Sequence, residues 1–428
     1  MSVFDIFNRE KLARLITVIR QEGWRTAAAK TRRYLSDRLR GARIGRDEAY
    51  LDTFWQDMAR HGSFHVSQAP ALLSGTRRIA MIGDLYLPQC RKYRVAQPAE
   101  LWAGAGVEYT YSHYRDVPRS VALMQNATHL MFYRTLNDPV MAMYLYEARR
   151  LRLPVAYDLD DPLFSVSAYE TYENMKALPA AMKAHFLAEA PKYLSAMNQA
   201  DIVTVSTPGM AEHTRAYTAR PVYFRRNFAD AETLVAAEAA LMASPQREGA
   251  PFRVGFASGS MGHEIDFALI GDDIAAFLAA DARRQLVILG HFDVKLLPED
   301  LRGRVEAHEF SSYADYLDTL ATVDCAVMPL TDDAFNRCKS AVRVIDAAAV
   351  AVPSLVGSVS DMAHMVQDGA SGRVLEPGAS WRGALEEIAE PGVAAALGQA
   401  ARRDLLANWT ARPDLPVIEP ELLDWVKG

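Results

Sequence analysis

The sequence has few cysteines and no long apolar run, and both absences narrow the class of protein. Its 428 residues include three cysteines, Cys90, Cys325 and Cys338. They form no Cys-x-x-Cys pair and no His lies at zinc spacing, so we expect a reducing compartment and no structural zinc. No stretch approaches the roughly 20 apolar residues that span a bilayer. The longest candidate, VIDAAAVAVPSLVG, is interrupted by Asp346 and Pro353.

The amino terminus also lacks the unbroken apolar core of a secretion signal, so we expect a cytoplasmic protein. Residues 1–46 hold twelve Lys or Arg against four Asp or Glu, so they carry a charge of +8 within a total of −6. An apolar stripe at helical spacing predicts a basic amphipathic helix here, formed by Leu12, Leu15, Ile16 and Ile19. Two interpretations stay open: the helix lies on an anionic membrane surface, or it packs on the protein itself. No aromatic and basic platform accompanies the charge, so no nucleic-acid partner is expected.

The length of the chain predicts more than one hydrophobic core. From Arg78 onward, apolar strand patterns alternate with helical ones, which indicates parallel sheets covered by helices on both faces. We therefore predict an α/β protein with two Rossmann-like, doubly wound domains facing across a cleft. The predicted divisions are a basic helical extension at 1–76, a first domain at 77–228, an alanine-rich linker at 229–250, a second domain at 251–392 and C-terminal helices at 393–428.

Ligands of open α/β sheets bind beyond the carboxyl ends of the strands. In the second domain, one strand runs into the glycine-containing loop SGSMGH, after which a helix is expected over Phe267–Ala280. The loop backbone, with Ser258, Gly259 and Ser260, is suited to cradle a diphosphate, and His263 to contact donor hydroxyls or phosphate. The alternative is a tight strand-to-helix connection in which His263 is a helix cap or a hydrogen-bonding group.

A second candidate is the segment FNRCKSAVRVIDAAAVAV, where we expect a helix over Arg337–Val350. Lys339, Arg343 and Asp346 stand at i, i+4 and i+7, so they are predicted to share one helical face. The two cations would neutralise phosphates, and the carboxylate would accept from ribose hydroxyls. The alternative is an internal salt bridge between Arg343 and Asp346.

Two further clusters follow strands of the predicted first domain. VAYDLDDPLF places Asp158, Asp160 and Asp161 after a strand, where carboxylates bind a metal, act as a base or cap a loop. No fourth oxygen-rich ligand is near in sequence, so positioning of an acceptor is favoured over a metal site, with capping as the alternative. In GDLYLPQCRKYRV, Arg91, Lys92 and Arg94 are candidates to meet an anionic acceptor or the donor phosphates. Ordinary surface residues at a helix start are the alternative for this cluster.

Together these segments resemble the GT-B glycosyltransferases of the large retaining group known as group 1 or family 4. The resemblance runs from about Arg78 to Trp409. It is carried by DLDDPLF, by ADIVTVSTPGMAEHT followed by RRNFAD, by GFASGSMGHEIDF, and by FNRCKSAVRVIDAAAVAVPSLVGSV followed by DGASGRVLE. It implies that the second domain binds a nucleotide sugar and that the acceptor enters from the first.

Carried over by position, Asp346 resembles the carboxylate that holds the ribose, Asn227 the asparagine at the interdomain hinge, and Thr207 the residue that ends the last strand of the first domain. The chain departs from the family at two places. Cys338 stands where the first of two glutamates is usual, and the usual Arg and Lys after the first strand of the second domain are replaced by Ser258, Ser260 and His263.

A subset of the family has FN-x-x-KS at this helix start, which implies phosphate contacts by Lys339 and Ser340, with Asn336 in the same motif. The departures leave open whether the anomeric configuration is retained.

The resemblance implies a glycosyltransferase in which Lys339, Arg343 and the loop amides stabilise the departing nucleoside diphosphate. Asp160 or Asp161 would orient the acceptor hydroxyl. The resemblance implies that no metal is needed, and no cofactor is expected because the nucleotide sugar is a substrate. The acceptor would be a glycan, a lipid-linked sugar or a protein, and the setting bacterial surface polysaccharide synthesis. The alternatives are a non-catalytic subunit that binds a nucleotide sugar or glycan, and a GT-B-like epimerase of sugar nucleotides.

Overall fold

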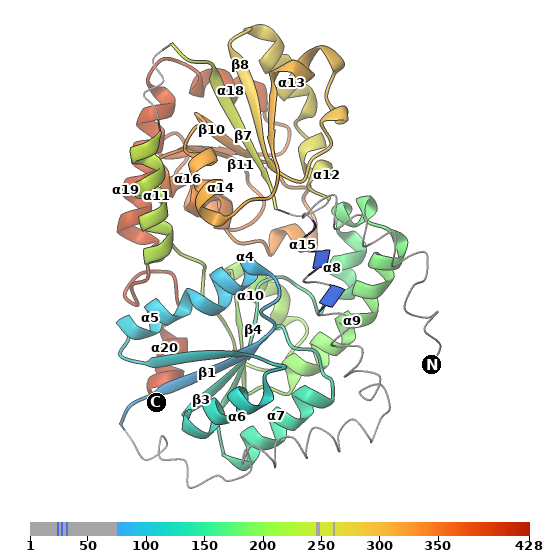
Figure 1. Cartoon of the computed structure of the whole chain (residues 1–428), viewed down its shortest axis with the longest axis vertical. Helices are drawn as coiled ribbons and strands as arrows, with labels where there is room; N and C mark the ends of the chain where they lie inside the picture. Colours follow the sequence, from blue (N-terminus) through green and yellow to red (C-terminus); the bar gives the residue numbers. More distant parts are fainter. Residues whose placement is uncertain (1–23, 25–26, 29–30, 33–74, 245–248, 260–261) are drawn as a thin grey trace. The chain divides into compact units, whose positions relative to one another are not determined.

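The computed structural model describes residues 24, 27–28, 31–32, 75–244, 249–259 and 262–428. The expected amphipathic helix, almost all of the 1–76 extension and Ser260 lie outside these residues. Each half of the described chain is built on one six-stranded sheet, and all strand pairs within both sheets are parallel. Figure 1 shows the first sheet in blue to green and the second in yellow to orange. The predicted fold class, two doubly wound α/β sheets, is confirmed.

The first sheet has the order β2-β1-β3-β4-β5-β6. Its strands are β1 (Arg78–Gly83), β2 (Glu108–His113), β3 (His129–Tyr133), β4 (Val155–Leu159), β5 (Ile202–Val205) and β6 (Val222–Phe224). The central strands β3, β4 and β5 are buried along their whole length, which explains their continuous apolar runs. The helices of this half are α4 (Pro88–Cys90), the π-helical turn η2 (Arg91–Ala96), α5 (Pro98–Gly104), α6 (Val117–Asn126), α7 (Pro139–Arg150), α8 (Val166–Thr171), the short η3 (Glu173–Ala177), α9 (Ala180–Asn198) and α10 (Pro208–Arg215).

The second sheet has the order β12-β11-β10-β7-β8-β9. Its strands are β7 (Phe252–Ser258), β8 (Arg284–Gly290), β9 (Val305–His308), β10 (Cys325–Met328), β11 (Ser354–Gly357) and β12 (Gly372–Leu375). The helices are α11 (Ala231–Ala243), α12 (His263–Ala268), α13 (Gly271–Ala280), η4 (Val294–Leu296), η5 (Glu299–Arg304), α14 (Tyr313–Leu320), α15 (Ala334–Arg337), α16 (Val342–Ala349), α17 (Met362–Met365), α18 (Trp381–Ile388), α19 (Val393–Asn408) and α20 (Pro420–Lys427). None of the helices in the described part of the chain has the length and apolar character to cross a bilayer.

Short polar caps after the strands start several helices. Asp138 accepts from the amide of Met141 at the start of α7, and Thr207 accepts from Met210 at the start of α10. Each cap is followed by a proline at the first helical position, where the missing amide hydrogen costs nothing. These caps fix where the chain turns at the carboxyl ends of β3 and β5, the edge where a ligand site is expected.

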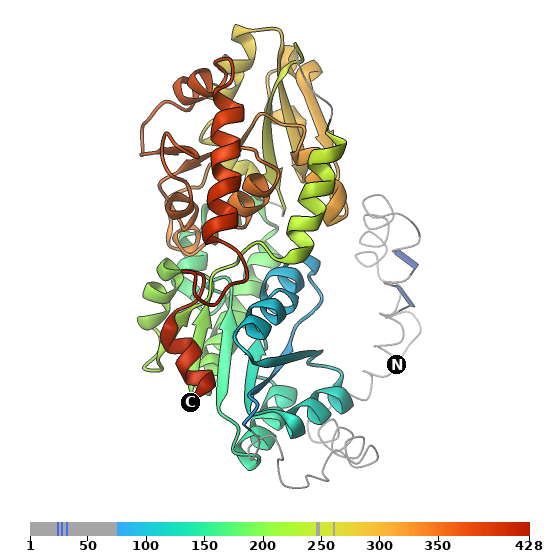
Figure 2. The same cartoon turned by 90° about the vertical axis from the view of Figure 1, so that its left-hand side faces the viewer.

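The helices at the two ends of the second half pack in different places. The predicted linker contains α11, which packs against α14 and α16 of the second half. The last helix, α20, returns to β6 of the first half, and the ring of Trp425 contacts His129 there with centroids 4.9 Å apart. Figure 2 shows α20, in dark red, beside the first half.

One fully buried ion pair connects the first sheet to the chain segment that passes into the second half. The guanidinium of Arg94 donates to both carboxylate oxygens of Asp158 at 2.5 and 3.0 Å, and neither side chain is exposed to solvent. The same guanidinium donates to the carbonyl oxygen of Arg225 at 2.5 Å and to Oδ1 of Asn227 at 3.3 Å. Asn227 in turn donates to Oγ of Ser340 at 3.0 Å. A single chain of polar contacts therefore runs from β4 to the second half.

We expect the variant Arg94→Ala to lower the free energy of unfolding by about 3 to 5 kcal/mol, because it removes both close hydrogen bonds to the buried carboxylate of Asp158 and leaves it facing the guanidinium of Arg225 at 3.8 Å. The exposed neighbour Arg91 is the control, and Arg91→Ala should change the free energy by less than about 0.5 kcal/mol. Urea denaturation of both variants measures the difference. Equal stability of the two variants would contradict the structural role of Arg94.

Candidate active site

The candidate site lies where loops at the carboxyl ends of the two sheets meet. From the first half come the end of β4, with Asp160 and Asp161, and the segment after α8, with Tyr172 and Asn174. From the second half come the start of α12, the loop between α15 and α16, and the first turn of α16. Ring stacking joins the halves here, since Tyr172 lies parallel to Phe335 with centroids 4.2 Å apart.

Lys339 is the central cation of this site. Its ammonium lies 5.6 Å from the ring centroid of Tyr172 and 5.3 Å from that of Phe335. Burial opposes its charge, but Tyr172 and then Asp161 raise its pKa above the ordinary value for lysine. Among the described carboxylates, none comes within ion-pair distance of Lys339. The ammonium of Lys339 is therefore held by the rings of Tyr172 and Phe335 and by the more distant carboxylate of Asp161. It is left able to bind an anion.

The helix predicted over Arg337–Val350 is interrupted, so Lys339 does not share a helical face with Arg343 and Asp346. That prediction was wrong. α15 ends at Arg337 and α16 begins at Val342. The carbonyl oxygen of Cys338, which a continuous helix would pair with the amide of Val342, accepts from Oγ1 of Thr207 at 3.0 Å.

Neighbouring backbone contacts reinforce this interruption. The carbonyl oxygen of Lys339 accepts from the amide of Asp361 at 3.2 Å. A Cβ added to Gly209 would lie 2.7 Å from the carbonyl oxygen of Arg337, so the first half approaches this loop at backbone distance. Tertiary contacts therefore occupy the carbonyl oxygens of Cys338 and Lys339, which a continuous helix would have used as hydrogen-bond acceptors.

Arg343 and Asp346 do not form the internal salt bridge considered as an alternative. Arg343 donates to the carbonyl oxygen of Ala257 at 3.4 Å, near the carboxyl end of β7, and burial lowers the pKa of its guanidinium. Asp346 accepts from Tyr93 at 3.0 and 3.1 Å and from Tyr313 at 2.7 Å. Arg343 therefore points toward the glycine-containing loop, whereas Asp346 is engaged by two tyrosines.

His263 lies at the first position of α12 and does not cap the helix. Its Nδ1 lies 2.9 Å from Oδ2 of Asp266, and burial lowers the pKa of the imidazole. Asp266 also accepts from Asn174 of the first half at 2.6 Å and from the amide of Thr331 at 3.0 Å. Burial opposes the charge of Asp266, but these hydrogen bonds lower its pKa, so it stays ionised and fixes the orientation of the imidazole.

The glycine-containing loop is shaped by close backbone approaches. Gly262 has a φ of +104°, and a Cβ there would lie 2.9 Å from the carbonyl oxygen of Asn174. Gly259 has open space around its Cβ position. Ser258 is fully buried, and its carbonyl oxygen accepts from the amide of His291 at 3.0 Å. Of the three predicted donor contacts here, Gly259 has room for a ligand, Ser258 is buried at the strand end and Ser260 lies outside the described residues.

The three aspartates after β4 have different surroundings. Asp158 is buried against Arg94 and also accepts from Oγ1 of Thr204 at 2.6 Å. Asp160 accepts from the hydroxyl of Tyr133 at 3.1 Å and lies 3.5 Å from the guanidinium of Arg134. Burial and then the charge of Asp160 raise the pKa of Asp161, while Lys339 opposes that shift. The pKa of Asp161 therefore depends on a charge from the second half, that of Lys339.

Several sequence-predicted site residues serve the fold instead. Arg94, predicted to meet an acceptor or phosphate, is fully buried with its donors occupied, so that prediction was wrong; Arg91 is exposed. Asn336 is buried, and its amide donates to the carbonyl oxygen of Thr331 and to Asp333, both at 3.0 Å. Ser340 accepts from Asn227. These side chains hold the loop that carries Lys339.

Sequence reasoning missed Tyr172, Asn174, Asp266 and Arg134. Arg134, at the end of β3, has a φ of +50°, an unusual value for a residue with a side chain, and donates to Sγ of Cys90 at 3.0 Å. A signal existed only for Asp266, which stands three residues after His263 at helical spacing. Within the described residues, no cluster of three or more His, Cys, Asp or Glu side chains could hold a metal ion. Metal independence stays a prediction.

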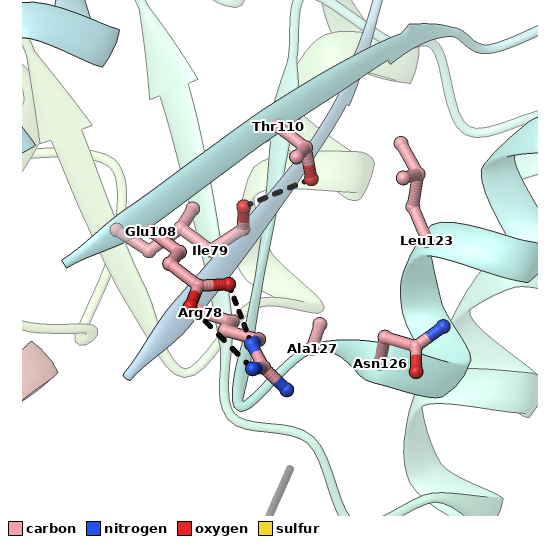
Figure 3. Close-up of a pocket in the computed structure, with 7 residues that line it drawn as sticks. All are labelled: Arg78, Ile79, Glu108, Thr110, Leu123, Asn126 and Ala127. Atoms are coloured by element: carbon pink, nitrogen blue, oxygen red, sulfur yellow. Dashed lines mark hydrogen bonds and ion pairs between the residues drawn. The ribbon is translucent and has the colours of Figure 1, made fainter. Parts of the chain in front are cut away.

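A pocket of about 330 Å³ lies at the opposite edge of the first sheet (Figure 3). It is lined by the amino-terminal residues of β1 and β2 and by the end of α6, namely Arg78, Ile79, Glu108, Thr110, Leu123, Asn126 and Ala127. None of the sequence-predicted site residues lines it, and Arg78 and Glu108 pair with each other at 2.6 Å. We therefore place the candidate site at the carboxyl edges and not in this pocket.

Comparison with known proteins supports the fold assignment. The sequence matches no protein-family model and no curated protein. Among solved structures, sucrose-phosphate synthase from Thermosynechococcus elongatus aligns with a TM-score of 0.52 and 14% identity, over 78% of this chain and 95% of its own. A glycosyltransferase from Rickettsia africae aligns with a TM-score of 0.51 and 11% identity, over 83% of this chain and 98% of its own. The two sheets thus have the GT-B arrangement of glycosyltransferases.

Asp346 makes the stability of this fold depend on pH. Burial raises its pKa from 3.8 to about 7, so between these values the folded protein holds a proton that the unfolded chain has lost. Its contribution to stability therefore falls as pH rises from 4 to 7. Relative to Asp346→Asn, the wild type should lose on the order of 4 kcal/mol of unfolding free energy over this range.

Denaturation of wild type and Asp346→Asn at about pH 4.5 and about pH 7.5, which lie just above the unfolded and the folded pKa of Asp346, measures this loss. Asp300→Asn, a substitution of an exposed aspartate, is the control and should show no such difference. A constant gap between wild type and Asp346→Asn across the pH range would contradict the buried, protonated state.

Proposed function

We propose that this protein is a glycosyltransferase that transfers a sugar from a nucleotide-sugar donor. The observation that carries the proposal is the pair of half-buried cations Lys339 and Arg343, placed at the carboxyl edge of the second sheet and opposite Asp161 of the first. Such a pair is suited to bind a diphosphate group, because its two positive charges balance the negative charge of the diphosphate. The GT-B fold of the structural neighbours supports the same assignment.

The proposed chemistry needs stabilisation of a leaving group more than a strong nucleophile. The bond between the anomeric carbon and the diphosphate oxygen breaks, and Lys339, Arg343 and the amide of Gly259 would take up the charge that develops on that oxygen. His263, oriented by Asp266, would contact donor hydroxyls or phosphate. Asn336 and Ser340 would support the loop that carries Lys339, since the amide of Asn336 donates to the carbonyl oxygen of Thr331 and the hydroxyl of Ser340 accepts from Asn227.

The acceptor hydroxyl would form the new bond to the anomeric carbon and lose its proton to a carboxylate of the first half. Asp161 suits this role, because a base works best when its pKa lies near the operating pH and burial raises the pKa of Asp161 toward it. Asp160, held by Tyr133, would orient the hydroxyl.

The proposed acceptor is a glycan, a lipid-linked sugar or a protein, and the proposed setting is bacterial surface polysaccharide synthesis at the cytoplasmic face of the membrane. The basic segment 1–46 supports contact with an anionic membrane surface, since lysine and arginine near a surface are attracted to acidic lipids. The nucleotide sugar would be a substrate, and no metal or other cofactor is proposed.

We expect Lys339→Ala to weaken the binding of nucleoside diphosphates roughly 10- to 100-fold, because a hydrogen bond to a charged group contributes about 1.5 to 3 kcal/mol. Arg337→Ala is the matched control, since Arg337 is exposed two residues away and pairs with Asp332. Thermal shift and calorimetry with UDP, GDP, ADP and dTDP measure binding. Unchanged affinity in Lys339→Ala would remove the phosphate role.

We expect Asp161→Asn to bind the donor nucleotide as the wild type does but to transfer sugar roughly 10²- to 10⁴-fold more slowly, the usual contribution of a general base. Release of nucleoside diphosphate and the labelled acceptor product are measured together. Nucleotide binding without any product in the wild type would favour a binding subunit, and an altered free sugar nucleotide would favour an epimerase.

A further inference from the structure

Asp346, the carboxylate that the sequence predicts to hold the ribose of the donor, is covered by the other half of the protein. Asp346 is 3% exposed and Tyr93 is 8% exposed. The hydroxyl of Tyr93, which lies in η2 of the first half, is 3.0 and 3.1 Å from the two oxygens of Asp346. The hydroxyl of Tyr313, at the start of α14, donates to the same carboxylate at 2.7 Å. A ribose can reach Asp346 only after one of these hydroxyls withdraws.

Tyr93 is the partner that a domain movement would withdraw. Tyr313 belongs to the same half as Asp346, and its position is set by α14 beside α11. Tyr93 reaches across from a π-helical turn, a type of turn that is rare and often found at functional sites. A tyrosine hydroxyl and a ribose hydroxyl offer the same hydrogen-bond donor, so they compete for one acceptor.

The residues next to Tyr93 hold the turn in place on both sides. The ammonium of Lys92 pairs with Asp230 at 3.1 Å and with Glu232 at 3.0 Å, and it lies 4.4 Å from the ring centroid of Tyr313. Arg94 is locked to Asp158. Because the flanking residues are anchored, loss of the Tyr93 contact would loosen the turn locally, by rotating one side chain or tilting the halves, while Lys92 and Arg94 keep their partners.

We infer that Tyr93 is a positioning residue that occupies Asp346 in the nucleotide-free protein and yields it to the ribose of the donor. This inference rests on the proposed function. It makes donor binding and the contact between Tyr93 and Asp346 mutually exclusive. Binding of the donor in the second half would therefore release Tyr93 and change the environment of the turn η2 in the first half. By linkage, whatever weakens the tyrosine contact strengthens nucleotide binding by the same factor.

The test compares Tyr93→Phe with the wild type for two ligands, a nucleoside diphosphate and inorganic pyrophosphate, which has no ribose. The nucleoside diphosphate is chosen as the tightest of UDP, GDP, ADP and dTDP for the wild type. Tyr93→Phe should bind it roughly tenfold more tightly, because the competing hydroxyl is gone. Affinity for pyrophosphate should not change. A merely structural tyrosine would weaken both ligands or neither.

Tyr109→Phe is the matched control, since the hydroxyl of Tyr109 donates to the carbonyl oxygen of Val95 in the same turn at 2.8 Å but does not reach Asp346. It should leave both affinities unchanged. Hydrogen exchange of residues 91–96 in the wild type is the second measurement, and exchange should rise when the nucleotide is added and stay constant when pyrophosphate is added.

The possible failures are distinct. Equal or weaker nucleotide binding by Tyr93→Phe, or unchanged exchange in residues 91–96 on saturation with nucleotide, overturns the inference and leaves the proposed function standing. Absence of binding by any of the four nucleoside diphosphates, in wild type and variant alike, overturns the proposed function together with the inference.

Discussion

The buried pair of Arg94 and Asp158 is the interaction on which the candidate site depends. Two charges removed from water need hydrogen-bond partners for all their polar groups. Asp158 lies in β4 and Arg94 in η2, and their further partners Arg225 and Asn227 lie in the chain segment that leaves the first half. The pair therefore fixes the position of the loop with Asp160 and Asp161. Through Asn227 and Ser340, it also sets the position of the loop that carries Lys339.

The run Lys92, Tyr93 and Arg94 shows how one turn can connect three parts of a protein. Lys92 pairs with acids at the start of α11, Tyr93 reaches Asp346 in α16, and Arg94 reaches β4. Side chains of consecutive residues on a helix point in different directions, and a π-helical turn widens the local backbone. As a result, a displacement of α16 would be transmitted to the first sheet through the short segment Lys92–Arg94, which is anchored by its side-chain contacts.

The sequence predicted the parallel strands other than the short edge strands β6 and β12, because buried strands such as β3 and β5 read as continuous apolar runs between polar turns. It also placed Asp161, Lys339 and Arg343 near strand ends, where the structure brings them together. It could not predict the interruption after Arg337, since helix propensity is local while the carbonyl oxygen of Cys338 is captured by Thr207, 131 residues away.

The burial of Arg94 has the same kind of cause. A basic residue at a helix start resembles a surface residue in sequence, and only the arrival of Asp158 and of the carbonyl oxygen of Arg225 turns it into a core residue. Likewise, nothing near Asp346 in sequence indicates that tyrosines 253 and 33 residues away will donate to it. Such contacts come from topology, so single-sequence patterns do not contain them.

The closeness of Lys339 and Asp161 links the two halves of the proposed reaction. The positive charge of Lys339 lowers the pKa of Asp161, while burial and Asp160 raise it. A diphosphate bound at Lys339 would cancel part of that positive charge at the carboxylate, so the pKa of Asp161 would rise further. Asp161 would then be the stronger base when the donor is present and the weaker one when the site is empty, which favours proton removal from an acceptor at the time when transfer can follow.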